Sequence, residues 1–234
     1  MEKTNELRRS GLRGDVGERA YKALRDGIMD GSIAPGQRLV ELAVCDWLQI
    51  SRTPAREALR RLQSNGLVEF SPGGGLQVVT YDVNALYELY VVREVLEGTA
   101  AGEAAKNATE AELLTLQESI RLQKNMSGDI HSFAKENQAF HAHIYHAAHN
   151  RFLVKTLQSL HDSVALLGPT AINSSEWVEH AIAQHSEIVE ALCQRDAAKA
   201  AEITRVHVRN GFERRLLALK RDTATPSLTP LPKA

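Results

Sequence analysis

The chain has 234 residues, a formal net charge of −1, 43% hydrophobic residues and 24% charged residues. This length and apolar fraction suffice for one large folded domain or two small ones. The near-zero net charge excludes a protein that binds polyanions over its whole surface, so any nucleic-acid interface must be local. No apolar run approaches the roughly 18 residues that a membrane-spanning helix needs, and the first residues lack a secretory signal. We therefore expect no membrane partner.

Charge, histidine and cysteine are unevenly placed along the chain. Residues 1–80 carry 12 Lys and Arg against 10 Asp and Glu, whereas residues 81–234 carry 16 against 19. All nine histidines follow residue 130. The two cysteines, Cys45 and Cys193, are far apart and suggest no disulfide, which favours the reducing cytoplasm. These distributions predict a basic first domain and an acidic second domain with different chemistry.

The pattern of residues 15–80 predicts a winged helix-turn-helix, preceded by a flexible N-terminus over residues 1–14. Thr53 is the expected N-cap of the third helix, with Pro54 at its first position. Apolar residues recur at helical spacing in three segments, at about 16–30, 40–48 and 53–65. Two short apolar segments at 67–70 and 76–80 flank a loop of Pro and Gly, which predicts a β-hairpin wing.

Residues 81–221 contain no strand signal and predict an antiparallel all-helical bundle. Short breaks separate six expected helices, at about 83–106, 109–125, 130–148, 151–168, 176–193 and 196–220. Residues 222–234 hold three of the seven prolines and are expected to be disordered. The predicted fold class is therefore mainly α, with an N-terminal winged helix-turn-helix and a C-terminal bundle.

Arginines line one side of the helix expected at 53–65. The apolar stripe of that helix is Ala55, Ala58, Leu59 and Leu62, and the opposite side carries Arg52, Arg56 and Arg60, with Arg61 at its flank. Arginine can donate two hydrogen bonds to guanine or clamp a phosphate, and the helix N-terminus near Ser51 and Thr53 favours a phosphate. A solvated basic face is the alternative interpretation, but the turn, the cap and the hairpin favour DNA recognition.

The same region resembles a known family. Its runs Pro35-Gly36-Gln37-Arg38-Leu39-Val40-Glu41, Ile50 to Leu62 (ISRTPAREALRRL) and Gly66-Leu67-Val68 are similar to the winged-helix domain of GntR-type bacterial transcription regulators. The resemblance implies that Arg52 and Arg56 contact operator DNA. We place five further residues in the same interface: Arg38, Ser51, Thr53, Arg60 and Gly74.

One residue and one loop depart from the family pattern. Leu42 stands where the family commonly has a polar or basic residue. The wing reads Gly73-Gly74-Gly75, without the basic residue that usually precedes its glycine. A glycine wing can approach the minor groove closely but adds no cation, so we expect weaker wing contacts and an altered operator preference.

Four polar residues lie among apolar neighbours on three of the expected bundle helices. Asn137 and His141 share a helix face at i, i+4, and His185 and His207 lie on two later helices. If they converge, three imidazoles and one amide oxygen suit a divalent metal, with zinc first and nickel or manganese as alternatives. Each histidine alone is more often a surface or core residue, and we expect that role for the other six: His131, His143, His146, His149, His161 and His180.

A second resemblance covers the bundle. Asn137-x-x-Phe140-His141-x-x-Ile144 is similar to the D-x-x-F-H pattern of the FCD ligand-binding domain, which marks the FadR subgroup of GntR regulators. By this match, Asn137, His141, His185 and His207 take the metal-ligand positions. The first ligand is more often Asp in that family. Asparagine keeps the oxygen but loses the charge, so a metal-free pocket is the alternative.

Arg93 lies in or beside an apolar stripe, where a buried cation needs a partner. One interpretation is an ion pair with Glu97 on the same helix. The other is that Arg93 binds an effector carboxylate through two hydrogen bonds, which the family's pattern of arginine followed four residues later by glutamate supports. Asn137 and Trp177 are assigned to the same effector pocket.

These features predict a ligand-responsive transcription regulator, and by resemblance most often a repressor. We expect a homodimer on a pseudo-palindromic double-stranded operator, released when a small organic acid binds the bundle. No catalytic residue and no enzymatic activity are predicted. Two alternatives stay open: a metal-dependent enzyme built on the three histidines, and an architectural DNA binder whose bundle only dimerises.

Overall fold

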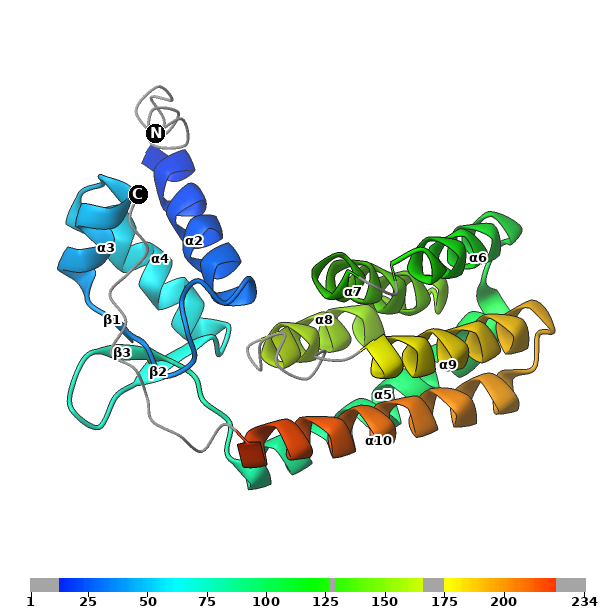
Figure 1. Cartoon of the computed structure of the whole chain (residues 1–234). Helices are drawn as coiled ribbons and strands as arrows, with labels where there is room; N and C mark the ends of the chain where they lie inside the picture. Colours follow the sequence, from blue (N-terminus) through cyan, green and yellow to red (C-terminus); the bar gives the residue numbers. More distant parts are fainter. Residues whose placement is uncertain (1–12, 127–128, 166–174, 222–234) are drawn as a thin grey trace. The chain divides into compact units, whose positions relative to one another are not determined.

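The computed structural model describes residues 13–126, 129–165 and 175–221, which form nine helices and one three-stranded sheet (Figure 1). The predicted tails, 1–14 and 222–234, lie almost entirely outside these residues. The chain divides into two compact units, the first built mainly from residues 1–80 and the second from most of residues 81–223. The predicted fold class, a winged helix-turn-helix followed by a helical bundle, is confirmed. No helix in the described part of the chain is long and apolar enough to cross a membrane.

The first unit combines three helices with a small antiparallel sheet. The helices are α2 (Arg13–Met29), α3 (Glu41–Leu48) and α4 (Arg52–Ser64), and the strands are β1 (Arg38–Leu39), β2 (Val68–Phe70) and β3 (Leu76–Val78). The strand order is β1-β3-β2, with Leu39 paired to Leu76 and Glu69 paired to Gln77. The hairpin β2–β3 was predicted. Strand β1 was missed, because two residues are too few to show an alternating pattern.

Helix α4 begins earlier than the sequence suggested. Ser51 is its N-cap with extended backbone (φ −76, ψ 168), and the helix starts at Arg52. The prediction of Thr53 as N-cap is therefore wrong. Pro54 stands at the third helical position, where it is tolerated because the first four N–H groups of a helix have no intrahelical acceptor. Gln49, in the left-handed conformation (φ 53), ends α3 and makes the tight turn into α4.

The apolar side of α4 forms the core of this unit. Its predicted stripe is buried throughout: Ala55, Ala58, Leu59 and Leu62. That stripe packs mainly on α2, whose buried residues include Ala20, Leu24 and Ile28. The opposite side of α4 is consequently presented to solvent.

The second unit is a bundle of six helices, close to the bounds that the sequence predicted. They are α5 (Val83–Asn107), α6 (Glu110–Lys124), α7 (Ile130–Ala147), α8 (Arg151–Ala165), α9 (Ser175–Cys193) and α10 (Ala197–Arg221). Helices α5 and α10 run side by side and share the most extensive contact in the unit (Figure 1). Their close approach depends on glycine: a Cβ on Gly98 would lie 2.8 Å from the Arg205 side chain.

Among the described residues, two apolar clusters of the bundle core include residues from different turns of α7. Phe140 and Ile144 belong to the larger cluster, together with Leu116 and Ile188. Phe133 belongs to a smaller cluster with three residues of α9: Val178, Ala181 and Ile182. Asn137 lies between these positions on α7. A short polar layer is thus built between two apolar regions of one bundle.

Candidate metal centre and nucleic-acid interface

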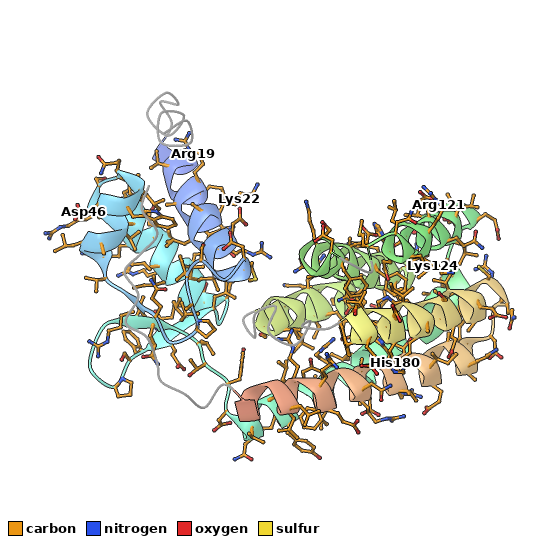
Figure 2. All side chains as sticks on the ribbon, in the orientation of Figure 1. Arg19, Lys22, Asp46, Arg121, Lys124 and His180 are labelled. Carbon is orange, nitrogen blue, oxygen red and sulfur yellow. The ribbon has the colours of Figure 1, made fainter. Side chains whose placement is uncertain are left out.

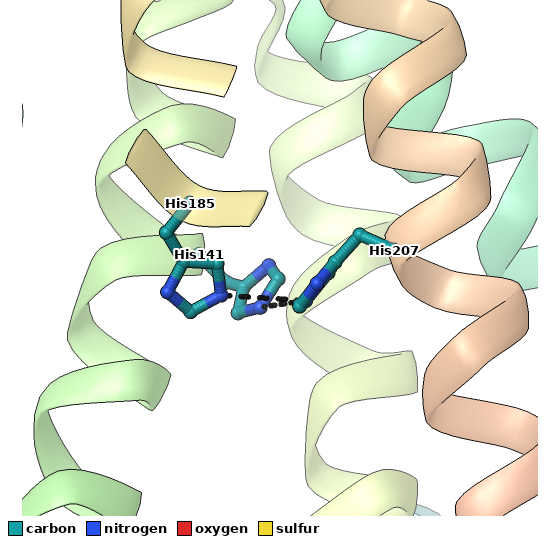
Figure 3. A group of neighbouring side chains, drawn as sticks. All are labelled: His141, His185 and His207. Carbon is teal, nitrogen blue, oxygen red and sulfur yellow. Dashed lines mark hydrogen bonds between the residues drawn. The ribbon is translucent and has the colours of Figure 1, made fainter. Parts of the chain in front are cut away.

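Three buried histidines from three helices meet in the bundle (Figure 3). His141 lies on α7, His185 on α9 and His207 on α10. The Nε2 atom of His207 is 3.3 Å from Nε2 of His141 and 3.3 Å from Nε2 of His185. One ring nitrogen from each of the three lies within 4.8 Å of the others. The structure therefore brings together the three histidines that the sequence singled out.

The other ring nitrogen of each histidine faces an oxygen acceptor. Nδ1 of His185 is 2.7 Å from Oε1 of Gln123, and Nδ1 of His207 is 3.1 Å from Oε1 of Gln184. Nδ1 of His141 is 3.2 Å from Oε2 of Glu97. Because each of these oxygens can accept a hydrogen bond from Nδ1–H, Nδ1 is the nitrogen that carries the proton when the ring is neutral, and Nε2 then holds a lone pair. Three Nε2 lone pairs directed at one another repel unless a cation lies between them, and this outer support is typical of metal-binding histidines.

Burial keeps two of these rings uncharged. Desolvation, reinforced by the neighbouring imidazoles, lowers the pKa of His185 well below its usual value. Desolvation, with His141 beside it, lowers the pKa of His207 to about 3. The neutral imidazole is the form that binds a metal ion. At neutral pH both rings are therefore ready to act as ligands.

Asn137 supplies an oxygen on the same face of α7, one turn before His141. Its Oδ1 atom is buried and accepts no hydrogen bond from the described residues. A buried polar atom without a partner is destabilising and is rare in folded proteins. A cation held beside the three imidazoles would give this oxygen a partner. Three imidazoles and one amide oxygen fit a borderline divalent cation such as zinc.

Arg93 and Glu97 form a buried ion pair beside the histidines. Arg93 Nε donates to Glu97 Oε1 at 2.7 Å, and the two side chains are 11% and 1% exposed. Burial opposes ionisation of Glu97, but the Arg93 guanidinium outweighs it and holds the pKa of that carboxyl far below its usual value. The same guanidinium lies 4.5 Å from the centroid of the Tyr90 ring. The predicted Arg93–Glu97 pair is therefore present, and one carboxylate connects Arg93 to His141.

Trp177 lies at the edge of the smaller apolar cluster on α9. Its ring meets Phe133 edge to face with centroids 6.1 Å apart, and the Arg214 guanidinium lies 5.4 Å from its centroid. These contacts give Trp177 a packing role. Its contact with an effector stays a prediction.

The remaining histidines behave as the sequence suggested where their side chains are described. His143, His146, His149 and His180 are exposed. His149 Nε2 lies 3.0 Å from Glu112 Oε2 at the start of α6. The side chains of His131 and His161 lie outside the described part of the structure.

Four arginines are exposed on α4, and two of them have carboxylate partners. Arg61 pairs with Glu18 and lies 4.0 Å from the centroid of the Tyr21 ring, both on α2, so it anchors two helices to each other. Arg56 donates from Nε and Nη2 to the two carboxylate oxygens of Glu41, at 2.9 and 3.0 Å. Arg52 and Arg60 take part in none of the ion pairs found among the described residues. Ser51 and Thr53 are exposed at the start of the same helix.

The wing acquires a cation from outside its loop. Arg38 is exposed on β1, next to β3, and its Nη2 atom lies 3.5 Å from Ser71 Oγ. A Cβ on Gly73 would overlap the Arg38 guanidinium, so the absence of a side chain at that position makes room for it. Gly74 and Gly75 both have positive φ (82 and 80) and turn the loop back. The loop itself carries no cation, as the sequence indicated, and Arg38 of β1 supplies a positive charge beside it. The weaker wing contacts expected from the sequence stay a prediction.

Comparison with known proteins decides the family. Residues 16–78 match the family "Bacterial regulatory proteins, gntR family", and residues 88–210 match the FCD domain. The chain belongs to the GntR family and carries an FCD domain. In the GntR family, it is 28% identical to the "Nta operon transcriptional regulator" of Aminobacter aminovorans over 199 residues, which cover 83% of this chain and 91% of that one.

Two further GntR-family comparisons agree with this assignment. The chain is 30% identical to the "Glc operon transcriptional activator" of Escherichia coli K12 over 207 residues, covering 78% of this chain and 82% of that one. The solved structure of a putative transcriptional regulator GntR from Rhodococcus sp. RHA1 shares the fold. Its TM-score is 0.72 at 22% identity, and the match covers 86% of this chain and 98% of that one. Because the curated relatives are transcriptional regulators, the metal-dependent enzyme is set aside, and this chain is a GntR-family transcriptional regulator.

Sequence reasoning did not identify the residues that orient the histidines and Arg56. Gln123 and Gln184 orient two histidines, and Glu41 holds Arg56. Gln123 and His185 are 62 residues apart on different helices, so no local spacing connects them. A weaker signal for both glutamines was present in the sequence: each occupies a position at which an amphipathic helix would place an apolar residue.

Proposed function

We propose that this GntR-family regulator binds a pseudo-palindromic operator as a homodimer in the cytoplasm, represses transcription, and leaves the DNA when a small organic acid binds its FCD domain. The carrying observation is the buried group of three histidines with Asn137, which offers a ligand site in the same chain as an arginine-lined helix. A regulator that senses a small ligand and also recognises DNA needs both parts.

The DNA interface follows from the exposed side of α4. Arg52, Arg56 and Arg60 are proposed to enter the major groove, since arginine can read guanine or bind phosphate. Ser51 and Thr53 are exposed at the helix N-terminus, where backbone N–H groups favour a phosphate. Arg38 and Gly74 are proposed to meet the adjacent minor groove through the wing, because Arg38 lies against the loop.

The effector site is proposed at the histidine centre. Asn137, His141, His185 and His207 would hold a divalent cation, with zinc first and nickel or manganese as alternatives. Such a cation supplies positive charge and open positions for a carboxylate oxygen. Glu97 accepts a hydrogen bond from the Nε–H of Arg93. The remaining N–H groups of Arg93 are proposed to bind the carboxylate of the effector. Trp177 is proposed to line the same pocket.

Helix α5 supports the homodimer. Its residues Val83, Tyr87, Val91 and Val95 are spaced four apart and are 45–58% exposed, and Val92 adds to them. Residues at this spacing lie along one side of a helix. A continuous exposed apolar stripe on a charged protein marks a protein–protein interface. A two-fold interface along α5 would supply the symmetry that a pseudo-palindromic operator requires.

The Glc operon relative is an activator by name, so activation is the second candidate, and an architectural role with a merely structural bundle is the third. Binding assays on the full-length chain separate them. An operator is first selected from random duplexes, and its Kd is measured at fixed salt with zinc and with a series of small carboxylic acids. We expect an acid that binds the protein to raise the operator Kd about tenfold or more, since a ligand must distinguish two states to shift them.

A control variant and a reporter strain complete this experiment. His185→Ala should abolish the response to the acid while its operator Kd without acid stays near wild type. A bound acid that leaves operator affinity unchanged would refute the sensing role and favour the architectural protein. In a reporter strain, deletion of the regulator should raise expression if it represses and lower expression if it activates.

A further inference from the structure

We infer that Glu41 is a positioning residue for DNA recognition: it turns Arg56 from a general phosphate contact into a reader of guanine. This inference rests on the proposed function, in which α4 enters the major groove. It concerns a carboxylate that neither the sequence nor the family match places in the interface.

The geometry of the pair carries the inference. Arg56 lies one turn into α4, and Glu41 is the first residue of α3. Arg56 Nε donates to Glu41 Oε2 at 2.9 Å, and Arg56 Nη2 donates to Oε1 at 3.0 Å. These two parallel bonds occupy the side edge of the guanidinium, which is the bidentate arrangement that fixes its plane. Arg56 nevertheless stays 56% exposed, and Glu41 is 28% exposed.

A guanidinium has a second edge with two parallel donors, formed by Nη1 and the outer hydrogen of Nη2. In this pair that edge makes no hydrogen bond with the described residues. The O6 and N7 atoms of guanine present two acceptors with the spacing that such an edge requires. Glu41 therefore holds Arg56 by one edge and leaves free the edge that fits guanine.

The pair also disfavours the competing role of Arg56. A free arginine on a recognition helix can swing to the nearest phosphate, which gives affinity without sequence information. Reaching a phosphate would break two charge-assisted bonds to Glu41. Ordering the side chain before binding also lowers the conformational entropy lost in the complex. The carboxylate itself repels the DNA backbone, so it weakens binding to all sequences while it improves discrimination among them.

The other exposed arginines of α4 provide an internal contrast. Arg61 is turned toward Glu18 and Tyr21 and serves the packing of α2. Arg52 is near enough to Glu41 to lower the pKa of that carboxyl, but neither Arg52 nor Arg60 donates a hydrogen bond to a carboxylate of the described residues. Neither side chain is therefore fixed by two bonds, and both can follow the phosphates. Arg56 alone of these four combines solvent exposure with a bidentate partner on the preceding helix of the motif. We therefore assign base reading to Arg56.

The test compares Glu41→Gln with a matched control in the full-length protein. Asp46→Asn removes the same charge from the same helix, and its side chain points outward from α3 (Figure 2). Operators are selected from random duplexes with the wild-type protein. Kd is then measured for the operator, for each single base-pair change in a half-site, for a random duplex, and for operators carrying 7-deazaguanine, which lacks N7.

In the wild type, one G·C pair per half-site should lose about tenfold in affinity when it is changed or when its guanine lacks N7. Arg56→Ala should abolish this discrimination at that pair. Glu41→Gln should reduce it at least about fivefold while tightening binding to the random duplex. Asp46→Asn should keep the discrimination. In the Arg56→Ala background, Glu41→Gln should have no further effect on discrimination.

The outcomes distinguish this inference from the proposed function. If Arg56→Ala loses the discrimination but Glu41→Gln retains it, α4 still reads DNA and the positioning role of Glu41 is overturned. If Glu41→Gln weakens all duplexes equally, Glu41 is structural only, and the inference is overturned as well. If the wild-type protein selects no sequence at all, the proposed function itself fails.

Discussion

Single residues decide how much charge the FCD site carries. The Arg93 and Glu97 charges cancel, because both groups are ionised and in direct contact. His185 and His207 are neutral at neutral pH. With asparagine at position 137, a bound divalent cation would keep one more uncompensated positive charge than it would beside aspartate. The asparagine site should therefore bind the cation less tightly and attract anionic ligands more strongly.

This charge difference can be measured with Asn137→Asp. The added carboxylate should raise zinc affinity on the order of tenfold, since it replaces a neutral oxygen beside the cation with a charged one. Competition against a chromophoric chelator gives the affinity. Gln138→Glu adds the same charge at the next residue of α7, about 100° around the helix, and should change zinc affinity much less. Equal affinities in wild type and Asn137→Asp would show that residue 137 is not a ligand.

At the scale of the element, the start of α6 is held by a capping box. Glu112 accepts hydrogen bonds from the backbone N–H and hydroxyl of Thr109, both at 2.8 Å, and lies 3.0 Å from His149 Nε2. His149 first, and then Thr109, lower the pKa of Glu112 to about 2. A carboxyl whose pKa is lowered by folding stabilises the protein above its unfolded value of 4.5, and this contribution is lost as pH falls toward 2.

Glu112→Gln should therefore lower the free energy of unfolding at pH 6 by about 1 kcal/mol, as expected for the loss of a helix cap. The difference from wild type should shrink when the pH is reduced below 4.5 toward 2. Urea denaturation followed by circular dichroism at several pH values measures both effects. Glu187→Gln, on an exposed position of α9, is the control and should be nearly neutral throughout. A difference that grows with acidity would contradict the assigned role.

The wing shows how one missing Cβ shapes an element. Gly73→Ala would place a methyl group where the Arg38 guanidinium lies. Because the far end of a flexible side chain can move, stability should change by less than about 0.5 kcal/mol. Operator affinity should nevertheless fall several-fold, and Arg38→Ala should also reduce the salt slope by about one. In the Arg38→Ala background, Gly73→Ala should have little further effect. Undiminished affinity in both single variants would remove Arg38 from the interface.

These elements show what the sequence can and cannot reveal. Helical periodicity predicted all nine helices of the described chain within a few residues, because each helix buries one apolar side. Asn137 and His141 were paired by their i, i+4 spacing. The meeting of His141 with His185 and His207 depended on family resemblance, since spacing along one helix says nothing about another. Strand β1, and with it the position of Arg38 on the wing, is set by pairing across 39 residues and left no local pattern.

At the scale of the whole molecule, a regulator of a two-fold operator must present its recognition helices in pairs. Each α4 contacts only a few base pairs, so a single copy of the protein has little sequence specificity. When two copies are linked, the second binding event is effectively intramolecular, which raises the affinity of the pair for the operator. The exposed stripe of α5 is the surface proposed above for this association. Dimerisation through the bundle would also place the effector site on the element that sets the geometry of the pair. Disrupting the stripe should therefore affect assembly and operator binding together.

The double variant Val91→Arg with Val95→Arg tests this link. Four cations facing one another across a two-fold axis should raise the dimer dissociation constant by about a hundredfold or more, because like charges at an interface cost several kcal/mol. Sedimentation equilibrium measures the dissociation constant, and circular dichroism checks that the bundle stays folded. Leu114→Arg changes an even more exposed apolar residue on α6 and should remain dimeric. The operator Kd should rise in the α5 variant and not in the α6 variant. A dimer that survives both arginines would move the interface away from α5, whereas a folded monomer with full operator affinity would refute binding as a dimer.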